Sequence, residues 1–349
     1  MKSIAADVHM SSITFTTLNE AGKILNQKTV ATSEKSIREY VAEIKGKKQL
    51  TFEEGPLAQW MVNIVSDDVD RVVVCNPRRN ALIYKGHSND TVDSKQLAEL
   101  LRLGALQEVY HSRDTKRQSF RELMNTYFKI NQDITRSKNR LKSVFRMKGI
   151  LCAGQKIYSK ANHDDWKKKL TGWSTTQNIA EIYWSQLSML ENQKSVMLSE
   201  IKKQSRPFKE IKEFLKLPGV GLVTASTFSA FIVTPWRFKN KAKVWAYCNL
   251  SLIENDTGKK LNKEVEMKRQ RKILRRLTRD GNRRLKSVLK TAAGVACHRA
   301  NDNDYKTMYQ SLRARGLDES SAMLTISRKL ACQLWGIWKR VETNQPIIT

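Results

Sequence analysis

The chain has 349 residues, of which 40% are hydrophobic, so it is long enough for two or three domains with buried cores. Lys and Arg number 63 against 34 Asp and Glu, and the formal net charge of +29 is high for a metabolic enzyme but typical of a protein that binds nucleic acid. Five scattered cysteines without a C-x-x-C pair, no secretory leader and no membrane-length apolar run argue against a disulfide-rich, zinc-binding, secreted or membrane protein and favour the cytoplasm.

The first part of the chain alternates between strand and helix signals. Apolar and β-branched runs predict strands at residues 4–6, 13–18, 24–30, 50–52 and 72–75. Apolar residues at helical spacing predict helices that begin near Ser33, Pro56 and Ser94. The order β-β-β-α-β-α-β-α predicts an α/β domain with an RNase-H-like fold over residues 1–110.

The middle of the chain, residues 111–205, is expected to be helical. Apolar residues recur every three or four positions from Phe120 to Val144 and again from Ile179 to Ile201, with Lys and Arg on the other face. Two such helices indicate a helical hairpin or a coiled coil, which packs within one chain or mediates self-association.

Residues 206–349 form a third, mostly helical block. A Gly-x-Gly turn, Gly219 to Gly221, precedes an apolar helical run and predicts a helix-hairpin-helix-like motif whose backbone N–H groups hold a phosphate. A basic segment follows, and an amphipathic helix is predicted at 320–338. Within that segment, which runs from Lys259 to Lys286, the residues expected to contact nucleic acid are Lys259, Arg283, Arg284 and Lys286.

Acidic residues stand at strand ends and beside a helix start in the first domain. Asp7 ends the first predicted strand, and Glu53 or Glu54 ends the fourth. Asp90 and Asp93 are three residues apart and can face one point. Carboxylates that converge in so basic a chain predict a divalent-metal site, because hard oxygen ligands suit Mg²⁺ and phosphodiester cleavage uses such ions.

Each acid also has a simpler interpretation. Asp93, next to Ser94, is a possible helix cap, and Asp90 is a possible loop residue. Asp7 is harder to explain in this way, because a carboxylate after an apolar strand usually has a partner.

A series of motifs, in order along the chain, resembles the DEDD insertion-sequence transposases, which are bridge-RNA-guided recombinases with a RuvC-like N-terminal domain. The motifs are the residues 4–8 around the first Asp, 52–55 around the Glu, 72–78 with the Asn-Pro-Arg, 89–98 with the D-x-x-D pair, 217–225 with the Pro-Gly turn, and 281–286 with the Gly-Asn start.

The resemblance implies an active site in two parts. Asp7, Glu53 or Glu54, Asp90 and Asp93 would bind Mg²⁺, and a serine of the C-terminal domain would attack the DNA backbone. DNA, a structured guide RNA and a homodimer or homotetramer are the implied partners.

The chain departs from the family at the nucleophile. The position that matches the family's serine is Thr257, and Ser251 is the nearest alternative, although it falls in a different part of the motif. Three interpretations stay open: a threonine nucleophile, a shifted serine, or an inactive copy, and Thr257 is favoured. In its Asn-Asp-Thr-Gly context Thr257 is also a common turn residue.

Three functions compete on this reading. The first is a transposase or recombinase that moves an insertion sequence under the guidance of a structured RNA. The second is a metal-dependent, Holliday-junction-type nuclease that uses the acids without a covalent intermediate. The third is a non-catalytic nucleic-acid binder, which would tolerate the loss of every acid.

Overall fold

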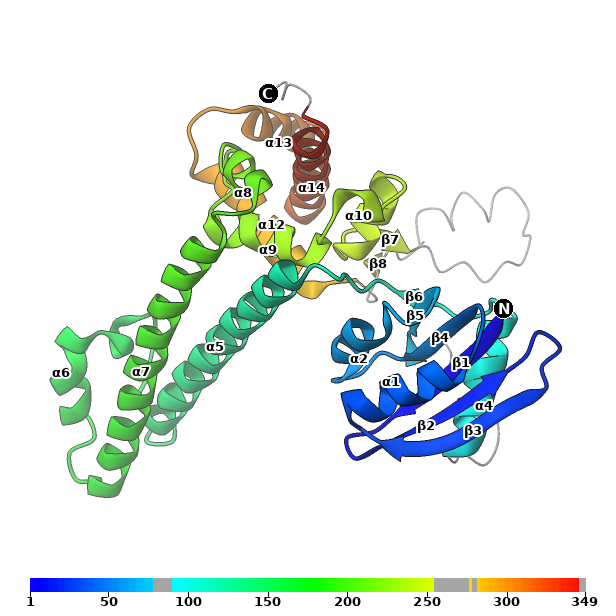
Figure 1. Cartoon of the computed structure of the whole chain (residues 1–349). Helices are drawn as coiled ribbons and strands as arrows, with labels where there is room; N and C mark the ends of the chain where they lie inside the picture. The colour runs from blue at the N-terminus through cyan, green and yellow to red at the C-terminus, as the bar shows by residue number, and fades with distance from the viewer. Residues whose placement is uncertain (78–89, 254–275, 278–280, 345–349) are drawn as a thin grey trace, which may run out of the picture. The chain divides into compact units, whose positions relative to one another are not determined.

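A computed structural model describes residues 1–77, 90–253, 276–277 and 281–344 (Figure 1). The chain divides into two compact units, Met1–Thr115 and Lys116–Thr349. The first combines a mixed sheet with helices and the second is mostly helical, so the α/β-plus-helical class expected from the sequence is confirmed.

A six-stranded sheet with the order β3-β2-β1-β4-β5-β6 forms the centre of the first unit. The first three strands are antiparallel, β4 is parallel to β1, β5 is parallel to β4, and β6 is antiparallel to β5. All five strands expected from the sequence are present, and the short β6 is an addition. The strands are β1 (Lys2–Val8), β2 (Ser12–Leu18), β3 (Ile24–Ala31), β4 (Lys48–Glu53), β5 (Arg71–Cys75) and β6 (Glu108–Val109).

Helices cover both faces of this sheet (Figure 1). Ile4 and Ala6 of β1 belong to the core beneath α1 (Glu34–Glu43) and α2 (Ala58–Val65). Ala5, between them, packs with Leu97 and Ala98 of α4 (Asp90–Arg102) on the other face. Successive side chains of a strand point to opposite faces, so the alternation along β1 assigns every residue of that strand to one helical layer.

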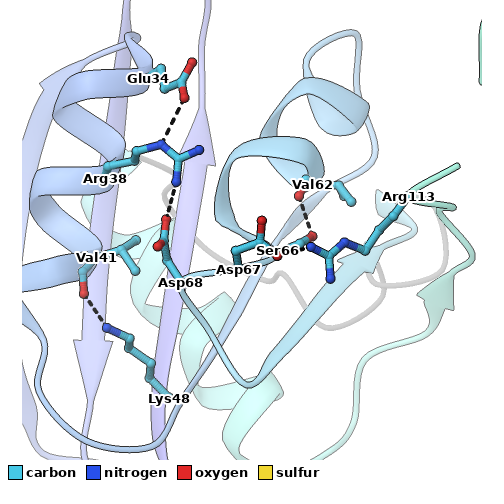
Figure 2. A network of polar contacts seen from close by, with 9 residues as sticks. All are labelled: Glu34, Arg38, Val41, Lys48, Val62, Ser66, Asp67, Asp68 and Arg113. Atoms are coloured by element: carbon cyan, nitrogen blue, oxygen red, sulfur yellow. Dashed lines mark hydrogen bonds and ion pairs between the residues drawn. The ribbon is translucent and has the colours of Figure 1, made fainter. Parts of the chain in front are cut away.

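Polar contacts fix the layer of α1 and α2 (Figure 2). Arg38 of α1 binds Glu34 at 2.9 Å and Asp68 at 2.7 Å, and Arg113 pairs with Asp67. The Lys48 Nζ atom donates to the carbonyl of Val41 at 2.6 Å and to that of Ile44 at 2.9 Å. A lysine thus satisfies carbonyls at the C-terminal end of α1, where the helix itself supplies no donors.

α4 begins earlier than the sequence suggested. The helix was expected to begin at Ser94, but its first residue is Asp90, so Asp93 lies within the first turn. The interpretation of Asp93 as a cap in front of the helix is therefore wrong. By contrast Ser33 caps α1 as expected, and its side chain accepts from the N–H of Ser36 at 3.2 Å.

Two long helices of the second unit pack antiparallel, α5 (Thr115–Arg146) and α7 (Ser174–Gln204) (Figure 1). Ile134 of α5 packs with Leu187 and Leu190 of α7, whereas Phe145, further along α5, packs with Trp184, earlier in α7. Short helices lie between them in the chain: η1 (Lys156–Tyr158), η2 (Lys160–Asn162) and α6 (His163–Lys168).

The remaining elements surround a core that contains Phe214, Phe228 and Trp338, all fully buried. α9 is buried at every position from Thr224 onward, which explains its lack of a polar face. The elements are α8 (Lys209–Phe214), α9 (Leu222–Ile232), η3 (Pro235–Arg237), α10 (Lys241–Tyr247), β7 (Leu252–Ile253), β8 (Arg276–Leu277), α12 (Arg283–His298), α13 (Asp304–Ala314) and α14 (Glu319–Thr343).

No helix within the described ranges has both the length and the apolar character needed to cross a membrane.

Candidate active site

The strand register brings Asp7 and Glu53 to neighbouring positions. β1 and β4 are parallel, and Ala6 lies opposite Phe52, so Asp7 and Glu53 each follow a paired residue at the same end of adjacent strands. Ala6 and Phe52 belong to the core under α1 and α2. By the alternation of the strands, Asp7 and Glu53 therefore point to the opposite face, which α4 covers.

The first turn of α4 carries Asp90 and Asp93 on this face. Hydrogen bonds from the sheet anchor that turn. The buried Ser94 hydroxyl lies 2.8 Å from the Thr16 hydroxyl, and Gln27 Nε2 donates to the Thr91 carbonyl at 3.1 Å. Residues on β2 and β3 thereby hold the two aspartates over the ends of β1 and β4.

The carboxylates influence one another electrostatically. Burial raises the pKa of Asp7, the nearby His9 opposes that rise, and the charges of Asp90 and Asp93 add to it. Burial also raises the pKa of Glu53, and the charges of Asp7 and Asp93 raise it further. Like charges that destabilise one another's ionised forms are a common arrangement around a cation.

His9 completes the cluster, and the sequence reasoning missed it. Its Nε2 atom lies 3.2 Å from Asp7 Oδ2 and 3.7 Å from Asp90 Oδ1. One atom each of Asp7, His9 and Asp90 lie within 4.8 Å of one another, close enough to bind a single metal ion. The signal in the sequence was the Asp-x-His spacing, because residues two apart near a strand end point to the same face.

Glu54 differs from Glu53 in its surroundings. It follows Glu53 by one residue and so points the other way from the strand end, and its backbone N–H donates to the Cys75 carbonyl at 2.8 Å. The charges of Asp7 and Asp93 raise the pKa of Glu53 in addition to the effect of burial. The geometry therefore favours Glu53 as the member of the acidic cluster.

The candidate nucleophiles belong to the other unit. Thr257 and the basic Lys259 lie outside the described residues. Ser251 is half-buried and directly precedes β7, which pairs with β8 through Leu252 and Leu277. The carbonyl of Leu250, just before Ser251, accepts a hydrogen bond from Arg328 Nε at 2.8 Å.

The two glycines of the Gly-x-Gly turn have different surroundings. Gly219 has a φ of +78°, and a Cβ atom there would lie 2.2 Å from the Ala292 carbonyl oxygen of α12. Gly221, by contrast, is exposed, and no atom lies within 4 Å of where its Cβ would be. The close approach of Gly219 to α12 accounts for a glycine at this position, and no bound ligand is needed to explain it. Gly221 has no such packing role.

The Gly-Asn start of α12 has a similar structural reason. A Cβ atom on Gly281 would lie 2.4 Å from the Ala246 carbonyl oxygen, at the end of α10. The Asn282 side chain accepts from the N–H groups of Arg284 and Leu285 and caps α12. The motif therefore locks the start of α12 against α10.

The basic residues that follow differ in exposure. Arg283 is exposed, whereas Arg284 and Lys286 are half-buried. Burial lowers the pKa of Arg284, and the charge of Arg121 lowers it further. The surroundings of Arg284 therefore disfavour its charged form.

Comparison with known families agrees with this geometry. A DEDD transposase model of the IS110 type, described as "Transposase", matches residues 4–148, which include all the acidic candidates. A second model, described as "Transposase IS116/IS110/IS902 family", matches residues 211–310. No curated protein matches the chain. The two matches follow one another along the chain and together span well over half of it, so the chain belongs to the IS110-type DEDD transposases, enzymes that recombine the DNA of insertion sequences.

Proposed function

We propose that this transposase cleaves and rejoins DNA with Mg²⁺ held by Asp7, Glu53, Asp90 and Asp93. The observation that carries the proposal is the convergence of carboxylates from two parallel strand ends and one helix on the same face of the sheet. Members of DEDD families generally use divalent metal ions, and a set of carboxylate oxygens suits Mg²⁺ among them.

The donor set fits the ion. A bound divalent cation would neutralise charges that now raise the pKa values of Asp7 and Glu53, and it would polarise the phosphodiester for attack. The chain's own residues orient these ligands: the bonds of Thr16 and Gln27 hold the first turn of α4, and the β1–β4 pairing holds the strand ends.

The N-terminal unit is proposed to be RNase-H-like, of the RuvC type. The strand order β3-β2-β1-β4-β5, with β1–β3 antiparallel and β4 and β5 parallel to β1, supports that assignment, as does the match to the DEDD model. The loop between α8 and α9 is proposed as a helix-hairpin-helix-like contact to the nucleic-acid backbone, made through the exposed Gly221 rather than through Gly219.

Thr257 is proposed as the nucleophile, with Ser251 as the alternative. In this step a hydroxyl oxygen loses its proton and bonds to phosphorus, the bond to the departing sugar oxygen breaks, and that oxygen takes up a proton. The protein–DNA ester keeps the energy needed for rejoining. A strand-transfer assay on supercoiled plasmid with Mg²⁺, followed by denaturation to trap the adduct, tests the assignment. Thr257→Ala should abolish the adduct and Ser251→Ala should not; the reverse result would transfer the role to Ser251.

A guide RNA and self-association complete the proposal. The net charge of +29 supports two nucleic-acid partners at once. Ile182, Met189 and Val196 of α7 are spaced by seven residues, and each is more than half exposed. Such a stripe supports pairing of α7 with a second copy, in a dimer or tetramer. Co-purified RNA and the mass of the particle in solution test the two points.

A nuclease without a covalent intermediate is the second candidate. The observation that favours it is that all the acidic residues of the cluster belong to the first unit. This alternative requires that neither Thr257→Ala nor Ser251→Ala changes cleavage, that the products are hydrolysed, and that no protein–DNA adduct is found.

A further inference from the structure

Two arginines of the second unit face the same aromatic ring. The Cζ atoms of Arg121, on α5, and Arg284, on α12, each lie 5.7 Å from the ring centroid of Phe231, on α9. Arg284 also lies over Phe128 of α5, at 5.3 Å. Three helices distant in sequence thus hold two guanidinium groups over one aromatic ring.

Arg121 and Arg284 carry like charges that influence one another. The charge of Arg121 contributes, after burial, to the lowered pKa of Arg284. Within the described ranges, neither guanidinium makes an ion pair with a carboxylate. Two like charges in a half-buried setting repel one another, and a bound anion would remove that cost.

Other buried arginines in the same unit are handled differently. Arg117, one turn before Arg121 on α5, binds Glu210 at 2.8 Å and the Ser229 hydroxyl at 3.0 Å. Arg328 donates to the Leu250 carbonyl at 2.8 Å. The fold therefore supplies acceptors for the guanidinium groups of Arg117 and Arg328, although among the described residues the buried Arg340 Nε atom has none. Arg121 and Arg284 differ from Arg117 and Arg328 in lying over one ring beside a like charge, which favours an acceptor from outside the protein.

The geometry points to a phosphate group. A guanidinium is a planar fork that binds phosphate oxygens with two parallel hydrogen bonds, and stacking on a ring fixes its plane. The start of α12 is not itself the site, because the Asn282 side chain already accepts from the N–H groups of Arg284 and Leu285. The side chains, half-exposed at the surface, are what an anion would meet.

We propose that Arg121 and Arg284 together clamp one phosphodiester group of bound nucleic acid. The inference rests on the proposed function only in requiring that the protein binds DNA or RNA; it requires no particular nucleophile or metal. DNA and RNA share the phosphodiester, so separate arms of the test distinguish them.

The test measures the affinity of the full-length protein for a short DNA duplex and for an RNA duplex of the same sequence over a range of salt concentrations. The variants are Arg121→Gln, Arg284→Gln and the double variant, and the matched control is Lys129→Gln, an exposed basic residue on the same helix as Arg121. Loss of one phosphate contact should lower the slope of log Kd against log salt by about 0.9 for duplex DNA. Each single variant should weaken binding about tenfold, and the double variant little more, because both side chains serve one phosphate.

Arg121→Lys and Arg284→Lys guard against misfolding, because they keep the charge while removing the fork. They should retain the salt slope and bind more weakly than the wild type. Additive losses in the double variant, or an effect of Lys129→Gln as large as that of Arg284→Gln, would overturn the clamp. The nucleic acid whose slope falls, DNA or RNA, identifies the source of the phosphate.

Asp7→Ala separates this inference from the proposed function. It should bind with the full salt slope and yet fail to recombine DNA. If Asp7→Ala recombined normally while the Arg284→Gln slope fell, the metal-site proposal would fail and the clamp would stand.

Discussion

The Nε2 atom of His9 lies 3.2 Å from the Oδ2 atom of Asp7, the carboxylate at the end of β1. The same nitrogen is 3.7 Å from Asp90 Oδ1, so His9 bridges a strand end and a helix start. An imidazole in this place either binds the metal ion or orients the carboxylates that do, and both roles increase metal affinity.

Replacing His9 should therefore weaken metal binding. We expect His9→Ala to lower the affinity for Mg²⁺ or Mn²⁺ by about 10- to 100-fold, the usual effect of losing a residue that orients metal ligands. Metal-induced increase of Tm measures the change. The matched control is Met10→Ala, since Met10 is the next residue and is 78% exposed. Tighter metal binding by His9→Ala would show instead that the imidazole competes with the ion.

Glu53 and Glu54 offer a paired test of strand alternation. Glu53→Gln should abolish metal-dependent DNA cleavage, because it removes the carboxylate whose pKa responds to Asp7 and Asp93. Glu54→Gln should leave cleavage within a fewfold of the wild type, since Glu54 points away from that face. Plasmid cleavage by the two purified variants, at equal folded fraction, decides between them. Equal loss in both would contradict the assignment of Glu53 alone.

The raised pKa values of Asp7 and Glu53 set a pH dependence. The folded protein holds these protons to a higher pH than the unfolded chain does, so the stability that they contribute is present at low pH and is lost as the pH rises through the folded pKa values. In EDTA, Tm should fall as the pH rises from the ordinary carboxyl range through the folded pKa values of Asp7 and Glu53. Asp7→Asn should flatten the fall, and Glu54→Gln, the control, should not.

Binding of Mg²⁺ should oppose this fall of Tm with rising pH. Protons and cations compete for the same oxygens, so the increase of Tm caused by Mg²⁺ should grow as the pH rises through the folded pKa values of the two acids. A metal effect independent of pH across that window would argue against Asp7 and Glu53 as ligands.

Alanine substitutions at Gly219 and Gly221 should have different effects on the free energy of unfolding. Gly219→Ala would force a Cβ to within 2.2 Å of the Ala292 carbonyl oxygen at a φ of +78°, and we expect a loss of about 2–5 kcal/mol of unfolding free energy. Gly221→Ala meets nothing within 4 Å and should change stability by less than about 1 kcal/mol. Urea unfolding measures both changes. A neutral Gly219→Ala would show that the turn is free to move away from α12.

The buried ion pair of Arg117 and Glu210 should be essential to the second unit. The exposed fractions of the two side chains are 14% and 4%, and their contact distance is 2.8 Å. Glu210→Ala removes the buried carboxylate that accepts hydrogen bonds from Arg117 and Ser229, and it should cost about 3–5 kcal/mol. Glu213→Ala, one turn later, removes an ion pair with the 58%-exposed Lys216 and should cost less than about 1 kcal/mol. Similar losses in the two variants, measured by urea unfolding, would contradict this ranking.

The sequence predicted best those features that depend only on residues close together in the chain. β-branched runs predicted five strands of the sheet, and Ser33 was recognised as a cap, because both depend on neighbouring residues alone. The candidate acids were found for a related reason: Asp7 and Glu53 follow buried strand residues, and a polar residue at that point in the pattern is conspicuous. Whether these acids bind metal stays a prediction.

Other features depended on contacts between segments far apart in the chain. The start of α4 at Asp90 was missed, since an isolated pattern does not reveal how Thr16 and Gln27 hold its first turn. β6 was missed because two residues carry no periodicity.

The amino-acid sequence alone determined the strands, the long helices, the net charge and the family of this protein. Strands and helices follow from the periodicity of side chains, the charge follows from composition, and the family follows from motifs in a fixed order. Only the tertiary structure decided that His9 joins the acids, that Gly219 packs on α12, and that Arg121 and Arg284 both lie over Phe231. The physical reason is that burial and electrostatic coupling depend on distances in space, which linear spacing does not encode for residues on different elements.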